Sequence, residues 1–185
     1  GTKGKQTVEF DMLTGKTDYK VYAIGIDETT GEFNTDVIFS DVITTPEQKQ
    51  SESYISIECD KYFDGFDLKE AYPSEFYDAD GWAVVPVEVE VHGDVVDYYY
   101  DIYSGDLTTA DGPDDIALIL DLEMYGSHNT PITMSYCYFY ETLTLVYFSK
   151  DSDDNNSAVT RVPLYLNPEQ CAPVSEFDYL GGAAK

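Results

Sequence analysis

Every side chain of the polar segment DSDDNN, at residues 151–156, carries oxygen. Asp151, Asp153 and Asn155 occupy every second position, and hard oxygen ligands spaced in this way can wrap a Ca²⁺ ion. Asn156 stands where a calcium loop needs its turn glycine, and Val162 stands where the loop needs a bidentate glutamate. Two interpretations therefore stay open: a weak calcium site, or a hairpin loop whose Asp and Asn side chains bond their own backbone. No other cofactor is predicted.

Aromatic side chains are abundant, with 17 tyrosines, and their flat apolar faces can stack on sugar rings. Some of them cluster in expected strands, where neighbours in sequence point to opposite faces, so about half should lie in the core. Others lie in the irregular segment at residues 61–81. The candidates for a ligand-binding surface are Trp82, Tyr98, Tyr100, Tyr62 and Phe66. The alternative is that these rings pack in the core and in loops.

Residues suited to catalysis are few. His92 and His128 are the only histidines, and neither lies in a metal-binding or triad motif. Because the chain has 36 acidic residues, some carboxylate pair will lie at the separation of a glycosidase by chance, so such a pair is uninformative. We therefore predict no enzymatic activity in this chain.

The three cysteines are Cys59, Cys137 and Cys171. An odd number leaves at least one thiol without a partner inside the chain, and no Cys-x-x-Cys or Cys/His cluster indicates zinc. A domain of this size needs no disulfide bond for stability, so we expect free and mostly buried thiols. Three different cysteine pairs could nevertheless form one disulfide bond.

The formal net charge is -26, and no Lys or Arg stands between residues 71 and 149. A nucleic-acid-binding protein needs a basic surface to displace counterions, so that class is excluded. Anionic membrane surfaces would repel the chain, and no apolar run approaches the length of a membrane span. The acidity fits a soluble surface, a neutral or cationic partner, or bound divalent cations.

The elements that must position these residues fall into two blocks. Alternation of apolar and polar residues predicts strands at 7–12, 19–27 and 37–45. Three strands bury little surface, so we expect this first block to pack against upstream strands, the second block or another copy. A polar linker at 47–53 follows, and a complete domain is predicted at 54–180.

In the second block, a turn at Gly93-Asp94 predicts that the strand at 95–103 pairs with the strand at 82–91. Further strands are predicted at 54–58, 132–140, 143–150 and 158–166. One helix is expected, with Pro113 as its first residue, its body at 116–125 and Gly126 as its stop. The tail at 181–185 should be disordered.

A family resemblance rests on LTGKTDYKVYAIGIDETTGEFNTDVIFSDVITTP, YYYDIYSGDLTTADGPDDIALILDLEMYG and ETLTLVYFSKDSDDNNSAVTRVPLYL. In the first segment, Leu13, Gly15, Thr17 and Tyr19 have the spacing of the corner that opens strand F of a fibronectin-type-III-like sandwich. The chain resembles the surface lipoproteins of Bacteroidetes, which carry tandem fibronectin-III-like or immunoglobulin-like domains.

This resemblance implies an all-β fold. Residues 1–46 would be the C-terminal half of one sandwich module, whose first half lies upstream, and residues 54–180 would be a complete immunoglobulin-like or fibronectin-III-like β-sandwich of about seven strands with one short helical insertion. Tyr19 would be a structural corner tyrosine whose hydroxyl bonds to nearby backbone.

The resemblance also implies an extracellular protein at the cell surface, attached to lipid through an upstream segment. The function would be non-catalytic recognition of a glycan or protein. The alternatives are a structural spacer or assembly subunit, with possible homo-oligomers formed by strand pairing, or an accessory domain of a larger secreted enzyme.

Overall fold

The computed structural model describes residues 7–10, 13, 15–47 and 49–178, and the chain divides into two compact units, 1–49 and 50–185. The boundary falls inside the linker predicted at 47–53. Strands dominate, and α1 (Gly65–Ala71) and α2 (Asp115–Tyr125) are the only α-helices in the described part of the chain, so the predicted all-β class is confirmed. The tail at 181–185 lies outside the described residues.

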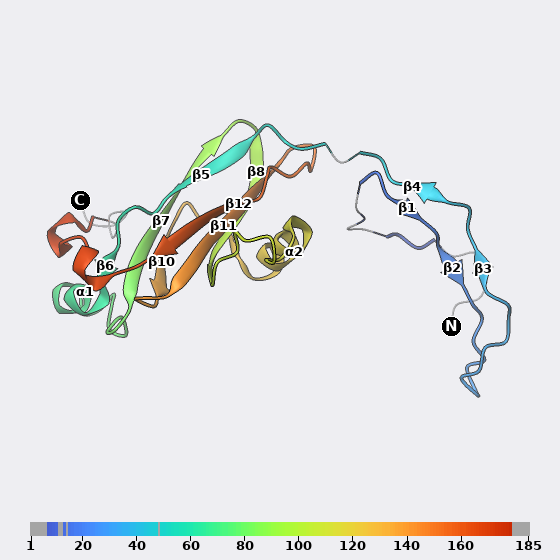
Figure 1. Ribbon diagram of the computed structural model, residues 1–185, viewed down its shortest axis with the longest axis horizontal. Helices are drawn as coiled ribbons and strands as arrows, with labels where there is room; N and C mark the ends of the chain where they lie inside the picture. The colour runs from blue at the N-terminus through green and yellow to red at the C-terminus, as the bar shows by residue number, and fades with distance from the viewer. Residues whose placement is uncertain (1–6, 11–12, 14, 48, 179–185) are drawn as a thin grey trace. The chain divides into compact units, whose positions relative to one another are not determined.

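The first unit is an antiparallel hairpin built from short strand pieces (Figure 1). β1 (Asp18–Tyr19) pairs with β4 (Ile43–Thr44), and β2 (Tyr22–Ala23) pairs with β3 (Ile38–Phe39). These pieces confirm the strands predicted at 19–27 and 37–45. The strand predicted at 7–12 is wrong for residues 7–10, which form no strand, and its other two residues lie outside the described part.

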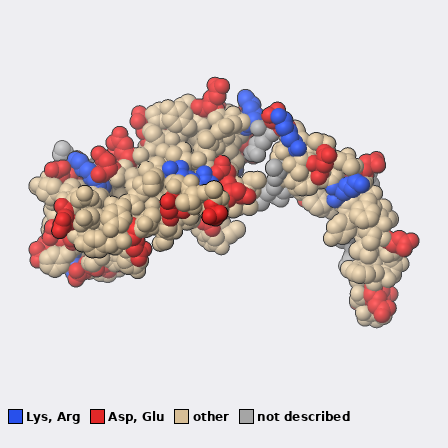
Figure 2. Space-filling view, viewed as in Figure 1, with Lys and Arg blue, Asp and Glu red and all other residues tan. Residues whose placement is uncertain are grey.

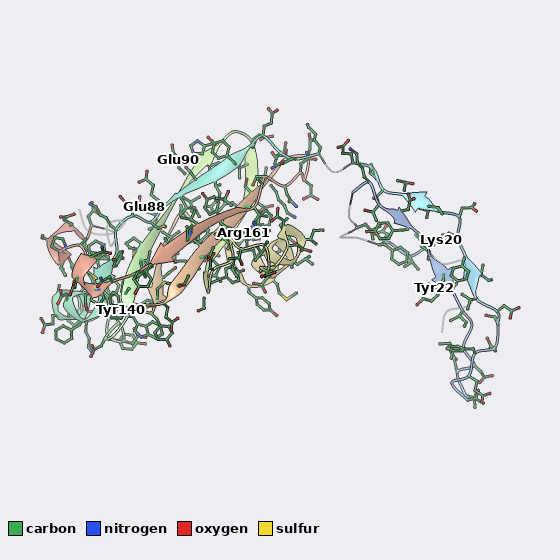
Figure 3. The ribbon with its side chains drawn as sticks, in the orientation of Figure 1. Lys20, Tyr22, Glu88, Glu90, Tyr140 and Arg161 are labelled. Atoms are coloured by element: carbon green, nitrogen blue, oxygen red, sulfur yellow. The ribbon has the colours of Figure 1, made fainter. Side chains whose placement is uncertain are left out.

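A hairpin alone has no second layer of structure that could bury its side chains. Among residues 7–10, 13, 15–47 and 49, none is buried. Ile38 and Phe39 are 69% and 64% exposed, and Tyr22, labelled in Figure 3, contacts the Phe39 ring at a centroid distance of 6.3 Å. An isolated two-stranded hairpin is marginally stable in water, so this unit needs further cover for its apolar side chains.

The second unit contains two antiparallel sheets. The β7 sheet has the spatial order β10 (Ile132–Cys137), β7 (Ala83–His92), β5 (Tyr54–Glu58), and β6 (Phe63–Asp64) pairs with the start of β7. The β11 sheet has the order β12 (Thr160–Tyr165), β11 (Thr142–Asp151), β8 (Val95–Ser104), β9 (Ser127–His128). Every strand predicted in this block is present; β6 and β9 are additional.

The two sheets pack against each other through alternate residues of their longest strands. The residues that fill this inter-sheet core include Ala83, Val85, Val87, Tyr98, Tyr100, Leu143 and Leu145. Because each strand sends every second side chain into this core, the remaining side chains of β7 and β11 face outward.

The predicted pairing of β7 with β8 is wrong. The turn itself is present, and Gly93 has a φ of 84°, which favours glycine. However, β8 leaves the β7 sheet at this turn and pairs with β11 and β9 instead. The physical reason is that a short turn can join two strands of one sheet or two strands of different packed sheets. Alternation within a strand does not show which other strand it pairs with.

Each sheet carries one helix on its outer face. α1 (Gly65–Ala71) begins after Asp64, whose carboxylate accepts the N–H of Phe66 at 2.8 Å. The prediction of an irregular segment at 61–81 missed this short helix. On the outer face of the β7 sheet, α1 packs with the 3₁₀ turn η2 (Val174–Glu176), and the second 3₁₀ turn is η1 (Pro168–Gln170).

α2 (Asp115–Tyr125) confirms the helix predicted at 116–125. Its cap is Asp114, which accepts the N–H of Ala117 at 2.8 Å, so Pro113 precedes the cap and is not the first helical residue as predicted. Leu118 and Leu122 are buried with outward-facing side chains of β11.

Candidate functional site

A group of aromatic rings is exposed at one end of the β7 sheet. Trp82 immediately precedes β7 and Tyr138 immediately follows β10, and the pairing of Ala83 with Cys137 brings the two rings side by side. Their centroids are 4.3 Å apart with an interplanar angle of 33°. Tyr138 is 52% exposed and Trp82 is half-buried.

Strand alternation explains why these rings face outward. Ala83 and Cys137 point into the inter-sheet core, so their neighbours Trp82, Tyr136 and Tyr138 must point to the other side. Tyr136 lies opposite Val84 and is 38% exposed. The outward direction of these three rings therefore follows from the burial of Ala83 and Cys137 in the inter-sheet core.

A loop between α1 and β7 adds a fourth ring. Within this loop, the side chains of Phe76 and Ala79 are buried, whereas Tyr77 is 70% exposed. Burial raises the pKa of the Tyr136 phenol, and the nearby charges of Asp78 and Tyr77 act in the same direction. We call the group formed by Trp82, Tyr138, Tyr136 and Tyr77 the aromatic platform.

The turns of this loop are held by the backbone. The N–H of Ala79 donates to the carbonyl oxygen of Phe76 at 3.2 Å, and the N–H of Trp82 donates to that of Ala79 at 3.0 Å. Gly65, the first residue of α1, donates to the carbonyl oxygen of Trp82 at 2.9 Å. The platform thus rests on a sheet and a helix rather than on a free loop.

Only some of the predicted ligand-binding residues lie at this site. Trp82 belongs to the aromatic platform. Phe66 is 48% exposed on α1 and is not one of the platform rings. The prediction is wrong for Tyr98 and Tyr100, which are 8% and 1% exposed in the inter-sheet core, because both have the same parity as the core-facing residues of β8. Tyr62 is also buried, and its hydroxyl donates to the backbone of residue 167 and accepts a hydrogen bond from it.

Tyr77, Tyr136 and Tyr138 were not among the predicted candidates. The sequence contained one usable signal, because Cys137 is a small apolar residue between two tyrosines, and free cysteine is among the most buried residue types. A core-facing Cys137 sends both tyrosines outward.

Two of the three residues predicted as weak calcium ligands, Asp151 and Asn155, bond each other through their side chains, and Asp153 takes part through its backbone N–H. The Oδ1 atom of Asp151 accepts the backbone N–H groups of Asp153 and Asn155 at 3.0 and 2.9 Å. The hydroxyl of Ser51 is the largest cause that lowers the pKa of Asp151 to about 2. Asp154 follows with a φ of 62°, in the left-handed region that Asp tolerates. This geometry supports the hairpin-loop interpretation, and within the described residues no three His, Cys, Asp or Glu side chains converge as a metal site.

The three thiols are free and lie in or against the inter-sheet core. Burial raises the pKa of Cys137 to about 12 and that of Cys171 to about 11, and burial also raises the pKa of Cys59. The thiolate is the reactive form of cysteine, so these raised pKa values keep the thiols unreactive at neutral pH.

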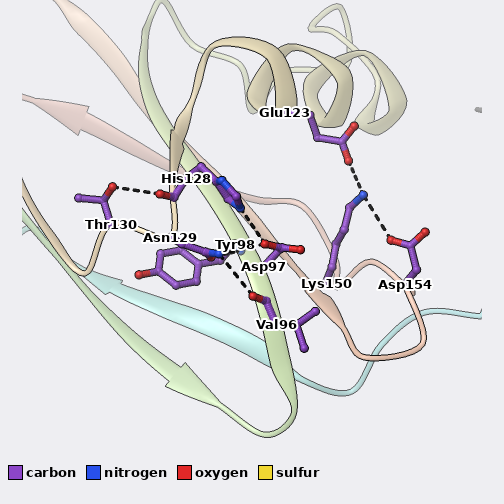
Figure 4. A network of polar contacts seen from close by, with 9 residues as sticks. All are labelled: Val96, Asp97, Tyr98, Glu123, His128, Asn129, Thr130, Lys150 and Asp154. Carbon is purple, nitrogen blue, oxygen red and sulfur yellow. Dashed lines mark hydrogen bonds and ion pairs between the residues drawn. The ribbon is translucent and has the colours of Figure 1, made fainter.

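A polar network surrounds His128 on the β11 sheet (Figure 4). Its Nε2 atom lies 2.7 Å from Oδ1 of Asp97, and its ring stacks on Tyr99 at a centroid distance of 4.5 Å. The hydrogen bond from His128 is the largest cause that lowers the pKa of Asp97. Within residues 50–178, all of which are described, no hydroxyl or thiol side chain is hydrogen bonded to this imidazole.

The same network extends to β11 through Lys150. Its Nζ atom pairs with Glu123 of α2 at 2.5 Å and with Asp154 at 3.5 Å. These contacts connect α2 to β11 and to the loop that follows it.

Every Lys and Arg of residues 50–178 is paired with a carboxylate. The pairs are Lys61 with Glu176, Lys69 with Asp80, Lys150 with Glu123 and Asp154, and Arg161 with Asp115. Figure 2 shows acidic side chains spread over the visible face with few basic ones between them. The surface of this unit is therefore negative, with its positive charges neutralised internally.

Comparisons with known proteins give no relatives: no family model matches the chain, and no curated protein or solved structure matches it. In the part of the chain that the structure describes, neither helix has the length and hydropathy needed to cross a membrane.

Proposed function

We propose that the second unit is a non-catalytic recognition module that binds a glycan at a cell surface through the aromatic platform. The observation that carries the proposal is the contact between the exposed ring of Tyr138 and the half-buried ring of Trp82. Their flat faces can stack against the C–H faces of sugar rings, while the indole N–H and phenol O–H can bond sugar hydroxyls.

The anchoring of the platform also supports this proposal. Rings that are already held in place lose little freedom on binding, so more of the contact energy appears as affinity. The platform lies at the ends of two paired strands, with α1 bonded beneath it through Gly65.

The arrangement of the sheets is consistent with a finer proposal, that residues 54–178 form an immunoglobulin-like or fibronectin-III-like sandwich. Two antiparallel sheets that enclose one core are the basis of that architecture. Such modules commonly serve as recognition domains at cell surfaces, and a negative surface whose cations are all paired suits a soluble extracellular module.

The test uses the fluorescence of Trp82, the only tryptophan in the chain. Titration with a panel of neutral and charged oligosaccharides should change its emission. Tyr138→Ala should weaken binding by about tenfold or more, since aromatic anchors dominate such contacts. Tyr165→Ala, on exposed β12, is the matched control and should leave the affinity unchanged. Wild-type affinity in Tyr138→Ala would rule out the platform as the site.

A second candidate function, assembly with other copies of the chain, is favoured by the first unit. Its hairpin has no buried residue among those described, and apolar side chains such as Ile38, Phe39 and Ile43 are more than half exposed. Unpaired strand edges of this kind can pair with another chain. Light scattering over a range of concentrations tests this candidate, which predicts a mass above the 20.8 kDa of one chain.

A further inference from the structure

We infer that the glycan bound at the aromatic platform carries ammonium groups, as oligomers of an amino sugar do. This inference rests on the proposed function, and it adds the charge of the ligand. The inference follows from the carboxylates near the platform and from the lack of unpaired Lys or Arg side chains in the described part of this unit.

Carboxylates lie beside the platform rings. Asp78 directly follows Tyr77 in the loop between α1 and β7, and both side chains are exposed. Asp80 of the same loop is paired with Lys69 at 3.7 Å, whereas no ion pair of the described residues involves Asp78. An exposed negative charge without an ion-pair partner is therefore available next to the exposed rings.

Further carboxylates lie on the outward side of β7, beyond the buried Val84 and Pro86. Glu88 lies directly opposite Glu58 of β5, and Glu90 follows two residues later (Figure 3). Like charges placed directly opposite each other on a sheet are destabilising, so a bound cation would relieve this repulsion. Glu88 and Glu90 have the same parity in sequence as Trp82, which immediately precedes this strand.

Unpaired positive charge that could receive an anionic glycan is missing from the described part of this unit. No Lys or Arg lies between residues 71 and 149, a range that includes every ring of the platform. The remaining cations of residues 50–178 are already paired. Uronate or sulfate groups would meet these carboxylates and no unpaired cation, whereas an ammonium group is attracted both by the carboxylates and by the faces of the aromatic rings.

The test compares oligomers of glucosamine with the same oligomers after N-acetylation, which removes the charge and keeps the sugar rings. Calorimetry should show tighter binding of the charged oligomer, weakening as salt is added. Asp78→Asn should lower the affinity for the charged oligomer about twofold to fivefold and leave the N-acetylated oligomer unaffected. Asp111→Asn, in an exposed loop elsewhere, is the matched control and should change neither affinity.

Each other outcome has a defined meaning. Equal affinity for both oligomers would overturn the inference and leave glycan recognition standing. Failure of Tyr138→Ala to weaken binding of the charged oligomer would overturn it as well, because the oligomer would then be held by net charge and not by the platform. Absence of binding by the charged oligomer, its N-acetylated form and the whole oligosaccharide panel would overturn both the inference and the proposed function.

Discussion

Gly65 donates its backbone N–H to the carbonyl oxygen of Trp82 at 2.9 Å, and this bond joins the first turn of α1 to the aromatic platform. The approach is close because Gly65 has no side chain. A Cβ atom at this position would lie 2.0 Å from the carbonyl oxygen of Ala79 and 2.8 Å from that of Trp82. The identity of residue 65 therefore controls how tightly the helix, the loop and the platform fit together.

Gly65→Ala should consequently destabilise the second unit and displace the platform. The added methyl group meets backbone atoms that cannot move independently, and overpacking of this kind costs about 1–3 kcal/mol. Urea unfolding followed by Trp82 fluorescence measures the cost, and the native emission should change as well. Gly112→Ala is the control, because its nearest neighbour would be 3.1 Å away and its effect should be smaller. Equal stability of both variants would contradict the close fit at Gly65.

Tyr100→Phe tests the assignment of Tyr100 to the core and not to a ligand surface. Its hydroxyl donates to the carbonyl oxygen of Thr130 at 2.9 Å, and burial is the main cause that raises its pKa to about 12. Loss of this bond should lower the free energy of unfolding by about 0.5–1.5 kcal/mol. Tyr165→Phe, on the exposed side of β12, should change it by less than about 0.5 kcal/mol. Glycan binding should be the same in both variants.

The contrast between Tyr100 and Trp82 shows how far sequence reasoning reaches in this chain. Alternation located the strands, and Pro113 and Gly126 located α2 to within a few residues, because these signals are local. Alternation also shows that neighbouring rings face opposite ways, but it does not say which parity is buried. That choice depends on which sheet a strand joins, and β8 joins the β11 sheet instead of pairing with β7. Which aromatic side chains face outward and which face the core therefore depends on non-local strand pairing.

Asp151 provides a pH-dependent test of its loop. Its pKa is about 2 in the folded chain against an ordinary value of 3.8, with the Ser51 hydroxyl as the largest cause. A lowered folded pKa means that this carboxylate stabilises the fold fully above pH 3.8, and that the contribution is lost as the pH falls toward 2. Asp151→Asn should therefore reduce the dependence of unfolding free energy on pH in this window and change it little between pH 5 and 7.

Calcium should not stabilise the chain, because the Asp151 carboxylate already accepts backbone N–H groups of its loop. A ligand that binds only the folded state raises the melting temperature. We expect the same melting temperature in millimolar CaCl₂ and in EDTA. A rise with calcium that disappears in Asp151→Asn would restore the calcium-site interpretation of Asp151, Asp153 and Asn155.

The hairpin of the first unit should exchange its amide hydrogens much faster than the second unit in dilute solution. The N–H groups of Ser40 and Thr45 are bonded across the hairpin, yet no described residue around them is buried, so local opening costs little. Amides of β7 and β11, which flank the inter-sheet core, should exchange slowly. If copies assemble through the hairpin, its exchange should slow as the protein concentration rises, while exchange in β7 and β11 stays constant. Slow exchange of Ser40 and Thr45 at the lowest concentration would show instead that the hairpin is already covered within one chain, and would count against assembly.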